Sequence, residues 1–414
     1  MTGLRVAMIG LRGLPAQAGG VERHVEELAA RLVDRGHEVT VFCRPGYAPD
    51  CGSTYRGIML AALPTVPVRG GEALVHSGFG AVAASRGGFD VAHFHAMGPG
   101  LFTPLTRAFG HCAVVQTIHG LDERRGKWGG GAQRILRTGA LLSAHVPDEV
   151  VVVSRALADH YRERYGRYTT YIANGAPTPG PVDLDLLDGF GLRPRGYLAF
   201  VGRMVPEKDP TLLVRAFRDV DTDLRLVLVG GSSHTDAYLD ELHALAARDP
   251  RVVLVGYQYG AALAALLAGA RTFVQPSLLE GLPIALLEAA AYGVPIVASD
   301  IAPHREVLGA PGPGRLTFRA GDQASLTSAL AASLGEDQGA ARAAASRLRD
   351  DVARRYDWSV ATDRLEAAYL HALQRRRSRS AAPVVAPVVA PVVAQSAPRS
   401  VSAVPEPMRQ VAAH

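Results

Sequence analysis

Two glutamates eight positions apart, Glu280 and Glu288, are the side chains of this sequence best placed to do chemistry. The stretch from Phe273 to Asp300 predicts strand, loop, helix, loop and strand, with Pro283 tolerated in the first turn of the helix. Glu280 then lies in the loop at the carboxyl end of a strand, the edge where open α/β sheets bind ligands. Glu288 is the one charge on an apolar helix, and a buried carboxylate is costly without a partner. Both glutamates are therefore predicted to face a ligand.

A second charged group follows an earlier strand of the same half. The loop 202–209, GRMVPEKD, carries Arg203 and Lys208 directly after the apolar run 197–201. A guanidinium offers bidentate hydrogen bonds and an ammonium a compact charge, so the two together can neutralise a diphosphate. The competing interpretation is an exposed pair of loop charges.

The first half holds weaker candidates. His119 ends an apolar run, 113–118, and faces where a cleft would lie, although a lone histidine is more often structural. His93 and His95 share one face of a strand, and two histidines without a third ligand are weak evidence for metal. We interpret both as structural. Gly19 and Gly20 precede a helix whose backbone amides could bind an anion, or they form an ordinary turn.

The elements that must position these residues alternate along the chain. Residues 4–43 predict a βαβ unit whose first turn is glycine-rich, and strands follow at 91–95, 113–118 and 149–154. After a proline-rich stretch the alternation restarts at 197. The pattern predicts two parallel, doubly wound domains. We assign 1–178 to the first domain together with a returning helix at 356–374, 179–195 to a linker, 196–355 to the second domain, and 375–414 to a disordered tail of Arg, Pro, Val and Ala.

The net positive charge of the chain lies in that tail. Its six arginines and one glutamate give +5, and the remaining 374 residues hold 38 basic and 38 acidic side chains. The folded part is therefore no basic surface, which disfavours nucleic acid. The arginine cluster after Gln374 could contact anionic lipid or mark a solvated boundary, and the sequence leaves both open. The cysteines lack metal or disulfide spacing, and no apolar run could span a bilayer, so a cytoplasmic protein is expected.

Taken together, four stretches resemble the retaining glycosyltransferases of family 4, which have the GT-B fold. PSLLEGLPIALLEAAAYGVPIVASD resembles their E-x7-E signature, and GRMVPEK resembles their donor-diphosphate loop. AGGVERHVEELAARLVDRGHEVTVFC resembles their N-terminal glycine loop and helix. HGLDERRGKWGG and VVVSRALADHYRERYG are similar to bacterial polysaccharide-assembly members. The resemblance covers about residues 4–373.

The resemblance implies a role for each site residue. Glu280 would contact the transferred sugar, Glu288 would hold the ribose of the nucleotide, and Arg203 and Lys208 would neutralise the leaving diphosphate. His119 would lie beside the donor sugar. The other donor-binding residues implied are Gly20, Gly202, Tyr257, Gly281 and Leu282.

The resemblance also implies a reaction. A sugar would pass, with retention of configuration, from a nucleotide-diphosphate sugar to a glycan or lipid-linked acceptor at the inner membrane face. Among donors, UDP- and GDP-sugars are the ones most expected. No cofactor and no metal are expected, since no Asp-x-Asp motif follows a strand. Two alternatives stay open: a nucleotide-sugar epimerase on the same fold, which would turn over donor without acceptor, and a non-catalytic glycan-binding homologue, which would bind donor without turnover.

Overall fold

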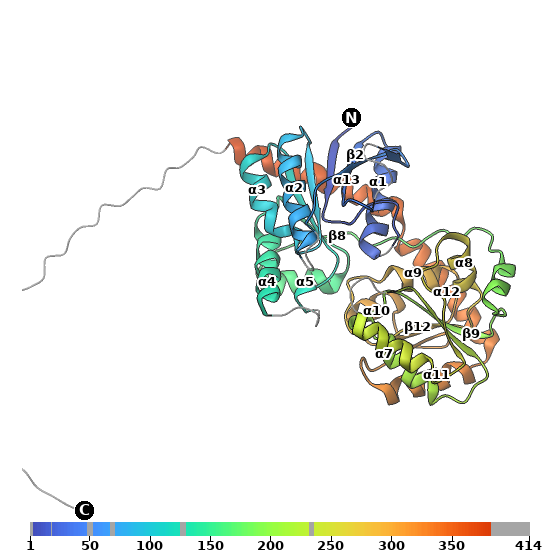
Figure 1. Ribbon diagram of the computed structural model, residues 1–414. Helices are drawn as coiled ribbons and strands as arrows, with labels where there is room; N and C mark the ends of the chain where they lie inside the picture. Colours follow the sequence, from blue (N-terminus) through green and yellow to red (C-terminus); the bar gives the residue numbers. More distant parts are fainter. Residues whose placement is uncertain are drawn as a thin grey trace, which may run out of the picture.

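Each half of the chain folds around its own parallel sheet, and the two lobes lie side by side in Figure 1. The computed structural model describes residues 3–17, 19–47, 53–66, 71–124, 130–231 and 236–381. Most strand side chains are buried on both faces, as expected where helices cover both sides of a sheet. The predicted pair of doubly wound α/β domains is confirmed.

The first sheet has the strand order β3-β4-β2-β1-β5-β6-β7-β8 and is parallel except for the short β3–β4 pair. Its strands are β1 (Arg5–Ile9), β2 (Glu38–Cys43), β3 (Thr54–Tyr55), β4 (Ile58–Ala62), β5 (Val91–His95), β6 (Ala113–Ile118), β7 (Glu149–Val152) and β8 (Thr170–Tyr171). Its helices are α1 (Gly20–Asp34), α2 (Glu72–Arg86), α3 (Thr103–Phe109), α4 (Gly130–His145) and α5 (Arg155–Tyr165). The carboxyl ends of its parallel strands form one edge, which faces the second lobe.

The second sheet has the order β11-β10-β9-β12-β13-β14 and is wholly parallel. Its strands are β9 (Tyr197–Val201), β10 (Arg225–Val229), β11 (Val252–Leu254), β12 (Thr272–Gln275), β13 (Ile296–Ser299) and β14 (Arg315–Phe318). Its helices are α6 (Pro210–Arg218), α7 (Asp236–Ala246), α8 (Gly260–Ala268), α9 (Ile284–Ala291), α10 (Ala302–Leu308), α11 (Gln323–Gly335) and α12 (Gln338–Arg355). Strands β9 and β12, which precede the predicted donor loops, are neighbours at its centre.

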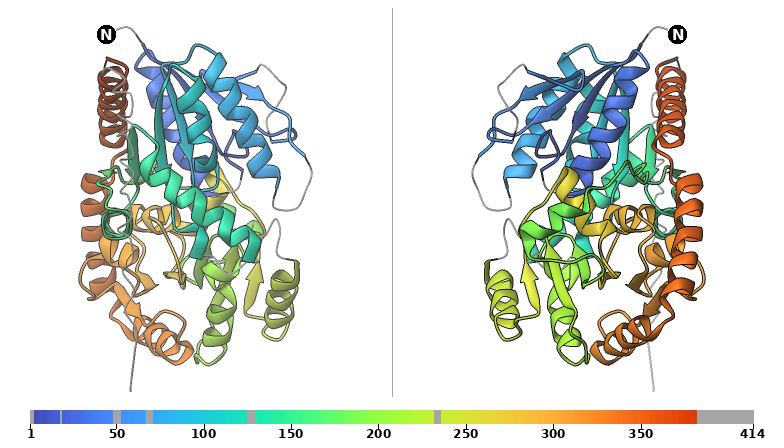
Figure 2. Two further views of the ribbon diagram at one scale, coloured as in Figure 1. Left: turned by 90° about the vertical axis from the view of Figure 1, so that its left-hand side faces the viewer. Right: turned by 90° about the vertical axis from the view of Figure 1, so that its right-hand side faces the viewer.

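The last helix, α13 (Trp358–Ala381), leaves the second lobe after α12 and packs against α1, β6 and β7 of the first. Figure 2 shows it standing beside the first sheet. Its apolar face, including Leu365, Tyr369 and Ala372, is buried in the first domain's core. The predicted returning helix is confirmed, and it runs on to Ala381, seven residues past the end read from its amphipathic pattern.

Three of the arginines after Gln374 contact the first domain. Arg375 and Arg376 donate to backbone carbonyls, and Arg379 forms an ion pair of 3.0 Å with the fully buried Asp148. This end of the helix is therefore pinned to the protein. The proline repeat lies outside the described residues, and within them no helix reaches the length and apolarity that crossing a bilayer requires.

Candidate active site

A cleft of about 910 Å³ lies between the two lobes. It is formed by the loops after β1 and β6 and the start of α1 on one side, and by the loops after β9, β11 and β12 with α9 on the other. The structure brings every site residue predicted from the sequence to this cleft: Gly20, His119, Gly202, Arg203, Lys208, Tyr257, Glu280, Gly281, Leu282 and Glu288. Their individual roles stay predictions.

Glu280 lies in the loop between β12 and α9 and forms an ion pair with Lys208. Its Oε1 accepts from Lys208 Nζ at 2.5 Å and from Gln275 Nε2 at 3.1 Å. Only 8% of the Glu280 side chain is exposed. Burial raises its pKa, but the nearby Lys208 charge and the hydrogen bonds outweigh burial, so the pKa lies below its ordinary value. Glu280 is therefore an ionised carboxylate inside the cleft at neutral pH.

The loop after β9 places both cations. A single 3-10 turn, Pro206–Lys208, ends at Asp209, whose left-handed φ of 49° and side-chain cap on Leu212 N turn the chain into α6. Lys208 thus points at the β12 loop. The two loops are joined directly, because Leu278 N donates to the Glu207 carbonyl at 2.9 Å.

Glu288 has the opposite electrostatic character. Within the described part of the chain, no group donates a hydrogen bond or forms an ion pair with its carboxyl group. Burial raises its pKa to about 7, while the charge of Arg23 on α1 lowers it and that of Glu27 raises it. Glu288 is partly exposed to the cleft, and the cost of desolvating its carboxyl group, which the sequence predicted would be met by a partner, is expressed here as a raised pKa.

The β12–α9 loop touches the first domain at glycine. A Cβ on Gly281 would lie 1.9 Å from the backbone oxygen of His119, so only glycine allows this approach. Among the described residues, none accepts a hydrogen bond from the N–H of Gly281 or Leu282. Two donors therefore line the cleft beside Glu280. Gly20 begins α1, and a Cβ there would meet only the Ile284 side chain, at 3.7 Å.

Three histidines gather behind this contact. The ligand atoms of His24, His95 and His119 lie within 4.8 Å of one another, and His95 Nδ1 is 3.1 Å from His119 Nε2. Burial lowers the pKa of His24 to about 4 and that of His95 well below its ordinary value, so both rings are neutral. These three histidines could hold a divalent metal ion. The expectation that the protein works without a metal stays a prediction. His93, between Tyr369 and Thr117, matches its structural interpretation.

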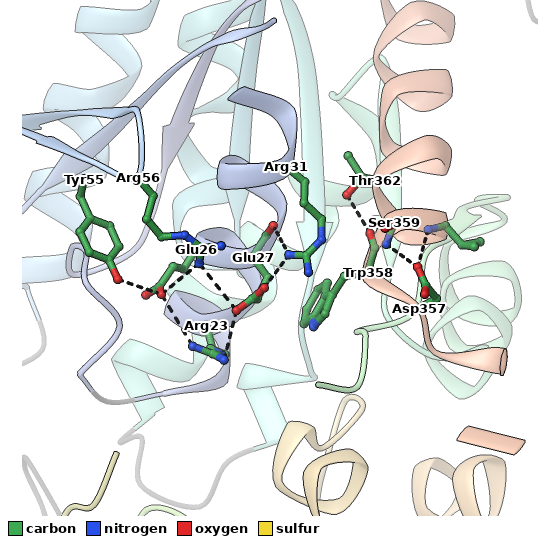
Figure 3. Close-up of polar contacts among 11 residues, drawn as sticks. Arg23, Glu26, Glu27, Arg31, Tyr55, Arg56, Asp357, Trp358, Ser359 and Thr362 are labelled. Carbon is green, nitrogen blue, oxygen red and sulfur yellow. Dashed lines mark hydrogen bonds and ion pairs between the residues drawn. The ribbon is translucent and has the colours of Figure 1, made fainter. Parts of the chain in front are cut away.

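The wall opposite the donor loops is charged, which the sequence analysis missed. Figure 3 shows Glu26 between Tyr55 and Arg23. The Tyr55 hydroxyl donates to Glu26 Oε1 at 3.1 Å. The other Glu26 oxygen accepts from the N–H of Ala16 at 2.7 Å and so holds the glycine-rich loop. The same loop contacts the second domain, because the hydroxyl of Tyr259 donates to the backbone carbonyl of Gln17. The spacing of acidic residues on α1 was visible, but not which loop they hold.

Comparisons with known proteins agree with this architecture. Residues 18–178 match the family described as Glycosyltransferase Family 4, and residues 195–336 match Glycosyl transferases group 1. A D-inositol 3-phosphate glycosyltransferase of Stackebrandtia nassauensis is 29% identical, with 90% of this chain and 92% of that protein covered. A phosphatidyl-myo-inositol mannosyltransferase of Mycolicibacterium smegmatis is 28% identical, with 85% and 90% covered.

Solved structures share the fold. Sucrose-phosphate synthase from Thermosynechococcus elongatus superposes with a TM-score of 0.76 at 21% identity, covering 92% of this chain and all of that one. HepE of Anabaena, solved with UDP and glucose, gives 0.73 at 18% identity, covering 88% and 98%.

Two facing parallel-sheet domains with a cleft between them define a glycosyltransferase of the GT-B fold that acts on sugar donors. More narrowly, the chain belongs to the family 4 glycosyltransferases.

Proposed function

We propose that this protein transfers a sugar, with retention and without metal, from a nucleotide-diphosphate sugar to a glycan or lipid-linked acceptor. The observation that carries the proposal is the Lys208–Glu280 ion pair inside the cleft, which is also lined by Arg203, a second cation that pairs with Glu207 at 3.6 Å. Breaking the bond between sugar and phosphate develops negative charge on the diphosphate and positive charge on the sugar. The cations and the carboxylate match these two charges.

Each remaining residue has a place in this reaction. Glu288 has a carboxyl group without a described hydrogen-bond partner, which suits the hydroxyls of a ribose. The amides of Gly281 and Leu282 are free to bind the sugar or phosphate, and Tyr257 lines the cleft near where the base would lie. The departing phosphate oxygen takes the proton of the incoming hydroxyl on the same face, which retains configuration at the sugar carbon.

The donor is expected to carry UDP or GDP. Relatives are named for inositol phosphate, phosphatidylinositol and glycogen, so the acceptor test needs a panel that includes all three classes. The experiment is transfer from UDP- and GDP-sugars by the wild type and by Lys208→Met. The variant should lose about 10²- to 10³-fold in kcat because it removes a preorganised charge from the leaving group. An unchanged kcat in the folded variant contradicts the proposal.

The need for an acceptor separates transfer from the two alternatives. Donor turnover that continues at full rate without acceptor would favour an epimerase. Donor binding without turnover, over the whole panel, would favour a binding protein.

Peripheral contact with anionic lipid is a separate proposal, and the structure changes its test. Cutting the chain at Gln374 would remove the contacts that pin α13, so lost liposome binding would not be specific. Truncation after Ala381 and the exposed Arg377→Ala variant remove charge without removing those contacts. Unchanged sedimentation with phosphatidylglycerol vesicles in both variants would reject this contact.

A further inference from the structure

Asn174, the only asparagine in the chain, lies where the chain leaves the first sheet after β8. It is 4% exposed. The residues after it contact the junction between α12 and α13: Ala176 N donates to the Tyr356 carbonyl at 2.7 Å, and a Cβ on Gly175 would lie 2.4 Å from the ring of Trp358, the first residue of α13. Asn174 therefore occupies a fixed point at the junction of the two lobes.

Its side chain joins both lobes. Asn174 Nδ2 lies 2.7 Å from the Leu282 carbonyl of the donor loop, and Oδ1 lies 2.8 Å from His24 Nδ1 on α1. A carbonyl can only accept, so the amide nitrogen must face Leu282 and the amide oxygen must face the ring. His24 Nδ1 consequently carries the proton of its neutral ring. The amide nitrogen and the amide oxygen of Asn174 each have a hydrogen-bond partner, and the side chain is shielded from solvent.

The contact falls on the loop that carries the predicted donor-binding groups. Leu282 is followed by Pro283, and the preceding Gly281 is pressed against the His119 backbone. The hydrogen bond to the Leu282 carbonyl orients the Leu282–Pro283 peptide group, and the His119 backbone packs against Gly281, so the two peptide groups that carry the Gly281 and Leu282 amides lie between the neighbouring loop residue Glu280 and a held point. Those amides, on Gly281 and Leu282, are the ones without an acceptor in the described protein.

We propose that Asn174 is a positioning residue: from the first domain, it holds the donor loop in the conformation that presents the Gly281 and Leu282 amides to the donor. The proposal rests on the proposed function and adds to it the group that couples cleft closure to donor binding. If the lobes separate, the Asn174–Leu282 hydrogen bond must break, because its two ends belong to different lobes.

The single asparagine allows a direct test on the wild-type chain. Protein labelled with [15N]asparagine gives one side-chain NH2 pair in a TROSY spectrum. With UDP-glucose or GDP-mannose bound, this pair should shift and its exchange with water should slow by at least tenfold relative to the free protein. Fast exchange at the rate of an exposed amide, with and without nucleotide sugar, would overturn the proposal whether or not the enzyme is active.

A variant pair supplies the kinetic arm. Asn174→Asp keeps the acceptor for His24 but places oxygen against the Leu282 carbonyl, so donor kcat/KM should fall at least tenfold while acceptor KM stays constant. Ser143→Ala is the matched control, since it breaks a buried 2.8 Å hydrogen bond to Tyr161 wholly inside the first domain. It should lower Tm without changing donor kcat/KM. Equal donor kcat/KM in Asn174→Asp and wild type would overturn the inference, whereas an inactive wild type would instead count against the proposed function.

Discussion

Replacing Glu288 by glutamine should make the protein more stable above pH 7, and the gain should vanish in acid. Burial raises the pKa of this carboxyl group from 4.5 to about 7, so the folded state binds a proton more tightly than the unfolded chain does. Its contribution is most favourable below pH 4.5 and is lost as the pH rises through about 7. The shift of about 2.5 units corresponds to about 3.4 kcal/mol, because one unit is about 1.36 kcal/mol.

The measurable part is smaller. At pH 5 the unfolded carboxyl group is already mostly ionised, so the change between pH 5 and pH 8.5 is at most about 2.5 kcal/mol. Urea denaturation at both pH values gives the difference in the free energy of unfolding between wild type and Glu288→Gln. The contributions of the other titrating groups cancel in this difference. The variant should gain stability relative to wild type at pH 8.5. A difference that does not change with pH would refute the reasoning.

Donor binding should follow the same titration. An ionised carboxylate accepts hydrogen bonds from ribose hydroxyls more strongly than a neutral one, by roughly 1–2 kcal/mol. The Kd of the wild type for its nucleotide should therefore tighten about tenfold between pH 6 and pH 8, and Glu288→Gln should lose this dependence. Tighter binding by the wild type at pH 6 than at pH 8 would contradict the ribose role.

Three further predictions address other parts of the cleft and its supports. Gly281→Ala should reduce donor kcat/KM more than tenfold, because its Cβ would lie 1.9 Å from the His119 backbone oxygen, and unaltered kinetics would show that the lobes do not meet there during turnover. Transfer should be insensitive to EDTA, and activity restored by added Zn²⁺ or Mg²⁺ would instead assign a metal to the histidine group. Arg379→Ala should lower stability by about 1–3 kcal/mol, because the buried Asp148 carboxylate loses its nearer counter-charge and keeps Arg107 at 3.8 Å. Arg377 is exposed, so Arg377→Ala should not lower stability, and equal Tm values for the two variants would contradict this.

The donor side of the cleft could be predicted from the sequence because its residues are local. Glu280 and Glu288 sit on one strand–loop–helix unit, and the glycine and proline signals around them locate the loop and the helix. Arg203 and Lys208 follow a single strand in the same way. Each group needs only the parallel-sheet rule to reach the ligand edge.

The first-domain side could not be predicted in the same way, because its contacts join distant segments. His24 meets Asn174 across 150 positions, and Asn174 meets Leu282 across 108. Asn174-Gly175 reads as a turn, and a turn asparagine gives no hint of a partner in the other domain. The sequence analysis also assigned no element between residues 43 and 91, where the structure has β3, β4 and α2.

The same physical cause, burial, pushes the two glutamates toward different chemistry. Desolvation alone would raise both pKa values. Glu280 has Lys208 at 2.5 Å and stays ionised, whereas Glu288 has no described partner and titrates at about 7. A bound diphosphate would compete with Glu280 for the Lys208 ammonium, weakening the ion pair just where positive charge grows on the sugar. Because the Lys208 charge is also what holds the Glu280 pKa below its ordinary value, a donor that drew Lys208 away would raise that pKa, and Glu280 stays ionised during the reaction only if the ammonium stays close to both groups.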